Sequence, residues 1–128
     1  MEQILPLKPP PTQFSTITDI PLVHKTTELY KKIYQISSGL PKKERLGIFL
    51  RLETTILEML ESAIEAAFLS RTEKLPMIMH LRRQTEIAKR LTRITHDLNL
   101  LDQTKYIRLS ADLQEISKMA NGWIKSLI

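Results

Sequence analysis

The chain has 128 residues and a formal net charge of +5, and this length corresponds to a single domain. It contains no cysteine, which excludes disulfides, thiolate metal sites and cysteine nucleophiles. The aliphatic residues are 20 Leu and 15 Ile but a single Val, and there are only 3 Gly. Leu is a good helix former, whereas strands favour Val, Thr and aromatic residues. The composition therefore predicts an all-α fold and nearly rules out an all-β one.

The positive charge indicates an anionic partner such as nucleic acid about as strongly as it indicates a surface that keeps the protein in solution. No apolar run of the sequence approaches the roughly 20 residues needed to span a bilayer. The N-terminal residues lack the cationic start and the apolar stretch of a signal peptide. We therefore expect a cytoplasmic protein that makes no use of a membrane.

Residues 1–20 are predicted to be an extended, proline-rich N-terminal arm. Four of the seven prolines fall between positions 6 and 11, and three of them are consecutive. Such a run supplies no backbone N–H groups and favours the polyproline conformation. A ligand for an aromatic groove is the less favoured interpretation of this segment.

From Pro21 onward the apolar residues recur with the period of a helix. The first predicted helix begins at Pro21, with Asp19 as a candidate cap, and ends in the Ser-Ser-Gly stretch at residues 37–39. The second begins behind Pro41 and is expected to run without interruption over residues 42–71.

Two more helices complete the predicted fold. Thr72 is the expected cap of the third helix, which ends near Leu98, and Asp102 is the expected cap of a fourth that reaches the C-terminus. Links of a few residues make consecutive helices antiparallel. Residues 21–128 are therefore predicted to form an up-down four-helix bundle.

The second predicted helix is apolar over too wide an arc for an ordinary bundle helix. Its apolar residues cover roughly 200° of the helical wheel, whereas an amphipathic surface helix needs little more than about 100°. This width favours homo-oligomerisation over a helix that is merely central to its own bundle. Glu53 lies inside the arc and must find a donor or an interface. The candidate interface or core residues here are Phe49, Leu52, Ile56, Met59 and Leu60.

The third predicted helix carries nearly all of the net charge, because residues 71–98 contain seven Lys and Arg against three Asp and Glu. Guanidinium groups bind phosphate oxygens bidentately, and no aromatic residue interleaves the cations, so contact with a nucleic-acid backbone is the expected mode. The alternative is a solvated face with Arg82–Glu86 and Arg93–Asp97 as pairs one turn apart. The candidate binding residues share one face of this helix and are Arg82, Arg83, Lys89, Arg90 and Arg93. Secondary contacts are expected around the first link, at Lys31, Lys32, Lys42 and Lys43.

The sequence offers little for catalysis or for cofactor binding. The glycines are too far apart for a phosphate-binding loop. None of His24, His80 and His96 follows a Glu by three residues, as in carboxylate-bridged metal bundles, so no metal and no cofactor is expected. Arg90 and His96 fit the loose Arg-x(4–6)-His pattern of HEPN-type ribonucleases, in which the His would act as acid or base. This ribonuclease is a remote alternative to a non-catalytic protein.

Several segments resemble one known family. They are residues 40–45, residues 57–67, Arg90-Leu91-Thr92 and, most tellingly, the run over residues 115–125 that contains Trp123. Trp123 shares a helix face with apolar residues and is expected to be a core or interface anchor. In these segments the chain resembles the accessory variability determinant (Avd) proteins of diversity-generating retroelements and their relatives encoded in intervening sequences of ribosomal RNA genes.

The resemblance implies a homopentameric ring of four-helix bundles with a positively charged surface. In the retroelement branch such a ring is a non-catalytic accessory protein that associates with reverse transcriptase and with nucleic acid, RNA or DNA, in mutagenic retrohoming. In the ribosomal branch it implies a structural homo-oligomer with no role in nucleic-acid binding. A pI near 9.6 and the basic face of residues 71–98 favour the retroelement branch.

Overall fold

The computed structural model describes residues 20–128, and within this range the chain is helical and contains no strand. The all-α prediction is therefore confirmed for the described residues. The predicted N-terminal arm and the candidate cap Asp19 lie outside them, apart from residue 20. The helices are α2 (Pro21–Ser38), α3 (Lys42–Arg45), α4 (Ile48–Phe68), α5 (Arg71–Asp97) and α6 (Gln103–Leu127).

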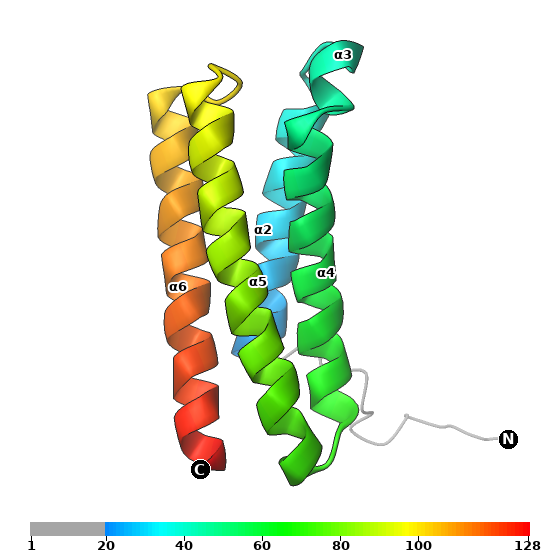
Figure 1. Cartoon of the computed structure of the whole chain (residues 1–128), viewed down its shortest axis with the longest axis vertical. Coiled ribbons are helices and arrows are strands. Elements are labelled where there is room, and N and C mark those ends of the chain that lie inside the picture. The colour runs from blue at the N-terminus through cyan, green and yellow to red at the C-terminus, as the bar shows by residue number, and fades with distance from the viewer. Residues whose placement is uncertain (1–19) are drawn as a thin grey trace, which may run out of the picture.

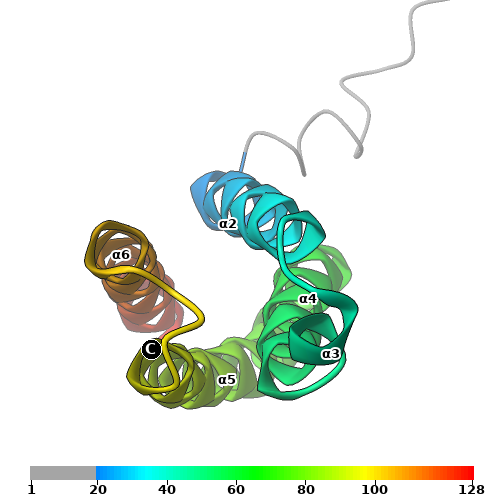
Figure 2. The same cartoon turned by 90° about the horizontal axis from the view of Figure 1, so that it is seen from above.

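The four long helices lie side by side, and the short α3 sits at the end where α2 finishes (Figure 1). The links α2–α4 and α5–α6 lie at this end, and the link α4–α5 lies at the other, near the C-terminus. Seen from above, the helices follow one another around a closed circuit in the order α2, α4, α5, α6 (Figure 2). The circuit closes where the last helix meets the first.

Each long helix turns one stripe of side chains toward a common core. The stripe of α4 contains Phe49, Leu52, Ile56 and Met59, all fully buried. On α5 the inner face is instead rich in threonine, and Thr85, Thr92 and Thr95 are buried without loss of hydrogen bonding. Each of these hydroxyls donates to the carbonyl oxygen four residues earlier, at 2.7–2.8 Å. A helix of low overall hydrophobicity can therefore line the core.

The prediction of one uninterrupted helix over residues 42–71 is wrong. The chain leaves the helical conformation at Gly47, which is the N-cap of α4 with φ −96° and ψ −131°, and α4 ends at Phe68. Leu46, between α3 and α4, is 61% exposed. The apolar pattern continues across the break, and only Gly47 marks it, since glycine costs about 1 kcal/mol in a helix interior relative to alanine.

The α4–α5 link is held by side chains of the first turn of α5. The N-cap is Ser70, two residues before the predicted Thr72, and its backbone N–H donates to the Glu73 carboxylate at 3.3 Å. The Lys74 ammonium donates to the carbonyl oxygens of Ala66 and Leu69 at 2.8 and 2.7 Å. These bonds satisfy acceptors that the end of α4 leaves without partners.

The α5–α6 link confirms the predicted cap at Asp102, whose carboxylate accepts a hydrogen bond from the backbone N–H of Lys105 at 2.8 Å. Asn99 has φ 65°, the left-handed conformation that Asn tolerates better than most residues. The backbone N–H of Leu100 then reaches the Thr95 carbonyl oxygen at 3.0 Å. This geometry reverses the chain within five residues.

No helix in the described range 20–128 combines the length and the apolar character that crossing a membrane requires.

A buried carboxylate joins α6 to α2 where the circuit closes. The side chain of Asp112 is 12% exposed and accepts hydrogen bonds from Lys25 at 3.0 Å and from Lys32 at 2.9 Å. Burial by itself would raise the pKa of Asp112, but the hydrogen bonds and the charges of the two lysines outweigh burial and lower the pKa below its ordinary value of 3.8. The ionised form is therefore the one that stabilises the fold.

We expect Asp112→Asn to destabilise the protein at pH 7 by about 1.5–3 kcal/mol, the typical worth of a hydrogen bond to a charged group. Because the pKa of Asp112 is lower in the folded than in the unfolded chain, its contribution is complete at neutral pH and is lost as the pH falls below about 3.8. Urea unfolding of the wild type and of Asp112→Asn at pH 7 and pH 3 measures the difference in their free energies of unfolding, which should be smaller at pH 3. Asp97→Asn is the matched control, since its ion pair with Arg93 is about 60% exposed on both sides. An equal effect of both substitutions at pH 7 would contradict the prediction.

Candidate nucleic-acid interface

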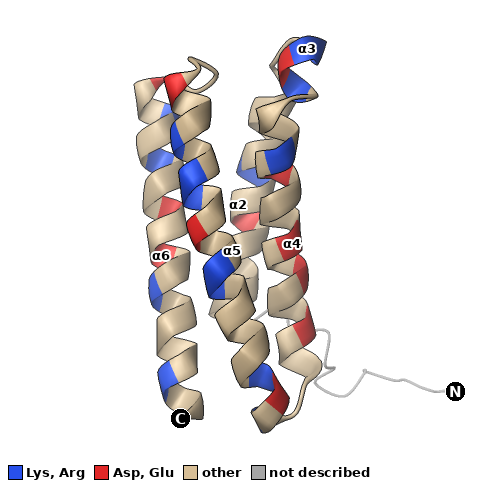
Figure 3. Ribbon diagram, in the orientation of Figure 1, with Lys and Arg blue, Asp and Glu red and all other residues tan. Residues whose placement is uncertain are grey.

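The five predicted binding residues of α5 all lie on its solvent-facing side, and we call Arg82, Arg83, Lys89, Arg90 and Arg93 the basic face. Figure 3 shows blue segments following one another along α5, with few red ones between them. The structure divides the set into three cations held by neighbouring side chains and two that are not. The first group has its positive charges fixed in position, and the second has hydrogen-bond donors available to an external anion.

Contacts with α6 position two of the cations. The Arg82 guanidinium donates to the side-chain oxygen of Asn121 at 3.1 Å. The Lys89 ammonium donates to Gln114 and to Glu86, both at 2.9 Å. These bonds hold the two positive groups over the seam between α5 and α6, so less side-chain entropy remains to be lost when an anion binds.

Glu86 is the acidic residue inside this network. Its carboxylate also accepts a hydrogen bond from the Ser117 hydroxyl at 3.3 Å. The hydrogen bond from Lys89 is the largest cause of a lowered pKa of Glu86, and the charges of Lys89 and Arg82 act in the same direction against partial burial. Arg82 is therefore near Glu86, although its hydrogen bond goes to Asn121.

Arg93 forms the pair expected for a solvated face. Its Nε lies 3.3 Å from the Asp97 carboxylate, and both side chains are about 60% exposed. The hydrogen bond and the charge of Asp97 raise the pKa of Arg93, and Tyr106 adds to the shift. An exposed pair of this kind is weak, so Arg93 can exchange Asp97 for another anion.

Arg83 and Arg90 are the two residues of the basic face that have no partner among the described residues. Both side chains are exposed, and neither forms an ion pair or a side-chain hydrogen bond within residues 20–128. They lie seven residues apart, which places them two turns and about 10 Å apart along the same face of the helix. Their five-donor guanidinium groups are therefore available to an external anion.

The predicted secondary contacts do not join the basic face. Lys31 and Lys32 lie on α2, on the opposite side of the circuit from α5 (Figure 2). Lys31 pairs with Glu28 at 3.2 Å, and Lys32 pairs with the buried Asp112. Lys42 and Lys43 are exposed on α3. The nine cations named from the sequence therefore lie on at least two separate surfaces.

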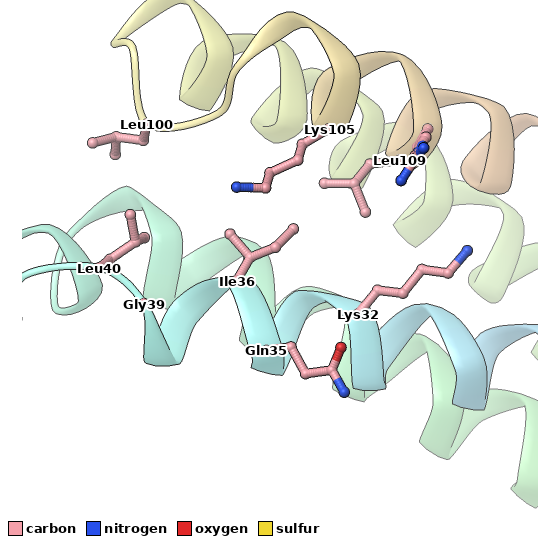
Figure 4. Close-up of a pocket in the computed structure, with 9 residues that line it drawn as sticks. Lys32, Gln35, Ile36, Gly39, Leu40, Leu100, Lys105 and Leu109 are labelled. Atoms are coloured by element: carbon pink, nitrogen blue, oxygen red, sulfur yellow. The ribbon is translucent and has the colours of Figure 1, made fainter.

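Sequence reasoning missed a cavity of about 630 Å³ between α2 and the start of α6. Figure 4 shows Lys32 extending from α2 and Lys105 extending from α6 into the space between the two helices. Arg108, one turn after Lys105, also lines it. The two groups of residues that meet here are at least 60 positions apart in the chain, so no local pattern could have revealed the cavity.

The ribonuclease alternative requires Arg90 and His96, and these two side chains differ in their exposure and in their contacts. Arg90 is exposed on the basic face. The His96 ring is half-buried, stacks on Tyr106 with 4.3 Å between the ring centroids, and has Nδ1 2.9 Å from the Leu101 carbonyl oxygen. His96 thus helps to hold the α5–α6 link.

The part of the chain that the structure describes contains no set of side chains that could bind a metal ion. Among residues 20–128, no three His, Asp or Glu side chains lie close enough together to hold an ion. The polar groups of the basic face are cationic and suit anions instead.

The fold and this face define a small helical protein with a preformed cationic surface on one helix. A sequence model of the bAvd-like family matches residues 21–127, and the chain therefore belongs to that family. The resemblance to Avd proteins is confirmed by this match. No curated protein and no solved structure matches the chain.

We expect Lys89→Ala to raise the pKa of Glu86 toward its ordinary value, because the Lys89 hydrogen bond is the main cause of the lowered pKa. Carboxyl-carbon NMR during an acid titration measures the midpoint for Glu86. Lys118→Ala removes the same charge from an exposed position on α6 outside the network and serves as the control. If the two variants leave the Glu86 midpoint at the wild-type value, Lys89 does not hold Glu86 in solution.

Proposed function

We propose that this protein is a non-catalytic accessory subunit of a diversity-generating retroelement, which binds nucleic acid and reverse transcriptase to support mutagenic retrohoming. The observation that carries the nucleic-acid part is the basic face of α5, where two exposed arginines with no partner among residues 20–128 lie beside cations that α6 already holds in place. Membership of the bAvd-like family supports an accessory role.

The chemistry of the basic face favours the phosphate backbone over the bases. Guanidinium groups match phosphate oxygens in geometry and in charge. The five cations are not interleaved with aromatic side chains on which bases could stack. We therefore propose binding with little sequence preference to the template RNA or its cDNA, in which released counterions supply much of the affinity.

We further propose that the chain is an up-down four-helix bundle and one subunit of a homopentameric ring. Four of the predicted interface or core residues are fully buried within the chain itself, namely Phe49, Leu52, Ile56 and Met59 of α4. Leu60 and Trp123 are partly buried and pack against the same core. The wide apolar arc nevertheless leaves an exposed remainder on α4. Its members are Leu50, Leu57, Ile64 and Phe68. Exposed apolar rows of this length indicate a protein contact.

The exposed row on α4 also supports the second candidate function. A structural homo-oligomer of the ribosomal-intervening-sequence type would need this contact surface and would not need the basic face. Nucleic-acid binding at the basic face is the property that separates the two candidates.

We expect the double variant Arg83→Glu, Arg90→Glu to lose nucleic-acid binding at least tenfold while its circular dichroism stays helical. If each arginine neutralises one phosphate, the slope of log K against log salt should fall by about 0.7–0.9 per residue. Filter binding of single-stranded RNA and DNA between 50 and 200 mM salt measures both quantities.

The control is Arg45→Glu, Arg51→Glu, which makes the same charge change at exposed positions on α3 and α4. Equal losses in both double variants would show that only total charge matters. No salt-sensitive retention by the wild type would reject the nucleic-acid part of the proposal and favour the structural homo-oligomer.

A further inference from the structure

The outer side of α4 combines apolar and acidic residues, and we call it the acidic-apolar face. Its apolar members Leu50, Leu57 and Ile64 follow one another at seven-residue spacing and are 44%, 37% and 36% exposed, and Phe68, one turn further on, is 58% exposed. The row extends over about 27 Å of the helix. Beside it lie the exposed acids Glu58, Glu61 and Glu65.

The acids of this face have no partner in the described structure. None of the three forms an ion pair within residues 20–128, and Figure 3 shows their red segments along α4. By contrast, Glu53, at the edge of the apolar row, lies near Tyr30 of α2, and burial together with the charge of Glu53 raises the pKa of Tyr30. The acidic-apolar face thus offers a row of aliphatic side chains with carboxylates along one side, and nothing in residues 20–128 covers it.

The cavity between α2 and α6 has the opposite charge and the same apolar character, and we call it the basic groove. Its aliphatic lining residues, which we call the floor, are Ile36, Leu40, Leu100 and Leu109, and its cationic lining residues, which we call the rim, are Lys32, Lys105 and Arg108. Figure 4 labels all of these except Arg108. No carboxylate lines it. With a volume of about 630 Å³, it has room for several side chains of a partner.

The rim cations are only partly neutralised. Lys32 has Asp112 at 2.9 Å, whereas the nearest carboxylate to Lys105 is Asp102 at 3.9 Å, between two side chains that are more than half exposed. Arg108 has no ion-pair partner within residues 20–128. The rim thus keeps positive charge that carboxylates of the same chain do not fully neutralise, and an anionic group on an aliphatic body would neutralise it and cover the floor.

We propose that the acidic-apolar face of one copy of this chain docks into the basic groove of a second copy. Leu57 and Ile64 lie over the aliphatic floor, and Glu61 and Glu65 pair with the rim cations Lys105 and Arg108 of the other copy. The complementarity of charge selects this occupant, because a nucleic-acid phosphate would leave the aliphatic floor uncovered. This inference deepens the homo-oligomer of the proposed function and does not depend on nucleic-acid binding.

The contact is heterologous, since the two patches are different surfaces of the same chain. Each copy then uses its α4 in one contact and its groove in another, and head-to-tail contacts of this kind give a ring where the rotation closes and a filament where it does not. The basic face of α5 belongs to neither patch. Assembly and phosphate binding therefore use separate surfaces.

Two variants test the docking, one for each side of the contact. Leu57→Glu, Ile64→Glu disables the acidic-apolar face, and Lys105→Glu, Arg108→Glu disables the basic groove; all four positions are solvent-exposed. Light scattering coupled to size-exclusion chromatography measures the mass of each. We expect the wild type to be an oligomer and each variant alone to be a monomer.

The equimolar mixture of the two variants is the decisive measurement. One variant keeps an intact groove and the other keeps an intact face, so a heterologous contact predicts a dimer that contains one copy of each and grows no further. Arg83→Glu, Arg90→Glu on the basic face is the matched control and should keep the wild-type mass. Circular dichroism checks that every variant is helical.

A second pair of variants keeps the test independent of the apolar substitutions. Glu61→Lys, Glu65→Lys should also weaken assembly, and its mixture with Lys105→Glu, Arg108→Glu should restore association through the exchanged charges. A wild-type monomer would overturn both this inference and the proposed ring. An oligomer whose mass none of these variants changes, or a mixture that stays monomeric, would overturn the inference alone, and the two patches would then serve other partners.

Discussion

The ionised carboxylate of Asp112 is the polar contact that ties the last helix of the closed circuit to the first, beside the apolar core that both helices share. It is the buried charge that joins α6, the last helix, to α2, the first of the described helices. A buried ion pair stabilises a fold only weakly compared with apolar packing, but loss of one partner is costly because the other charge remains. Asp112 also fixes Lys32, so the same contact that closes the fold sets one wall of the basic groove.

The net charge of +5 hides a separation of charge among the helices. The excess of cations is on α5, whereas the outer side of α4 carries three acids that have no ion-pair partner within residues 20–128. A polyanion near the chain is attracted by one helix and repelled by its neighbour. Under the proposed function, this separation of charge would direct a phosphate backbone away from α4 and toward the seam of α5 with α6.

Much of the fold could be predicted from the sequence because its signals are local. The helical period, Asp102 as a cap and the common face of Arg82 to Arg93 each depend on residues within a few turns of one another. The break at Gly47 was missed, since the apolar pattern runs through it. The prediction of Thr72 as the cap of α5 is wrong by two residues, because Ser70 is an equally good cap residue and the Glu73 carboxylate accepts from the backbone N–H of Ser70.

The functional surfaces were less predictable, since they depend on which parts of distant helices meet. A wheel shows that α4 is apolar over a wide arc, but it cannot tell that Phe49 is core and that Leu50 is exposed. The groove is lined by residues of two distant helices, such as Lys32 and Arg108, which are 76 positions apart in the sequence.

The two proposals reinforce each other electrostatically. Docking of α4 into the groove would pair the acids of each copy with cations of the next, and both sets would leave the solvent-exposed surface together. The basic face of α5 would stay exposed and would be repeated once in every subunit. Because fields from like charges add, an assembly built in this way would attract a phosphate backbone more strongly at each basic face than a single chain does, and more so at low salt, where the Debye length exceeds about 10 Å. Under these proposals, assembly through the acidic face is what turns one modestly basic helix into a nucleic-acid-binding surface.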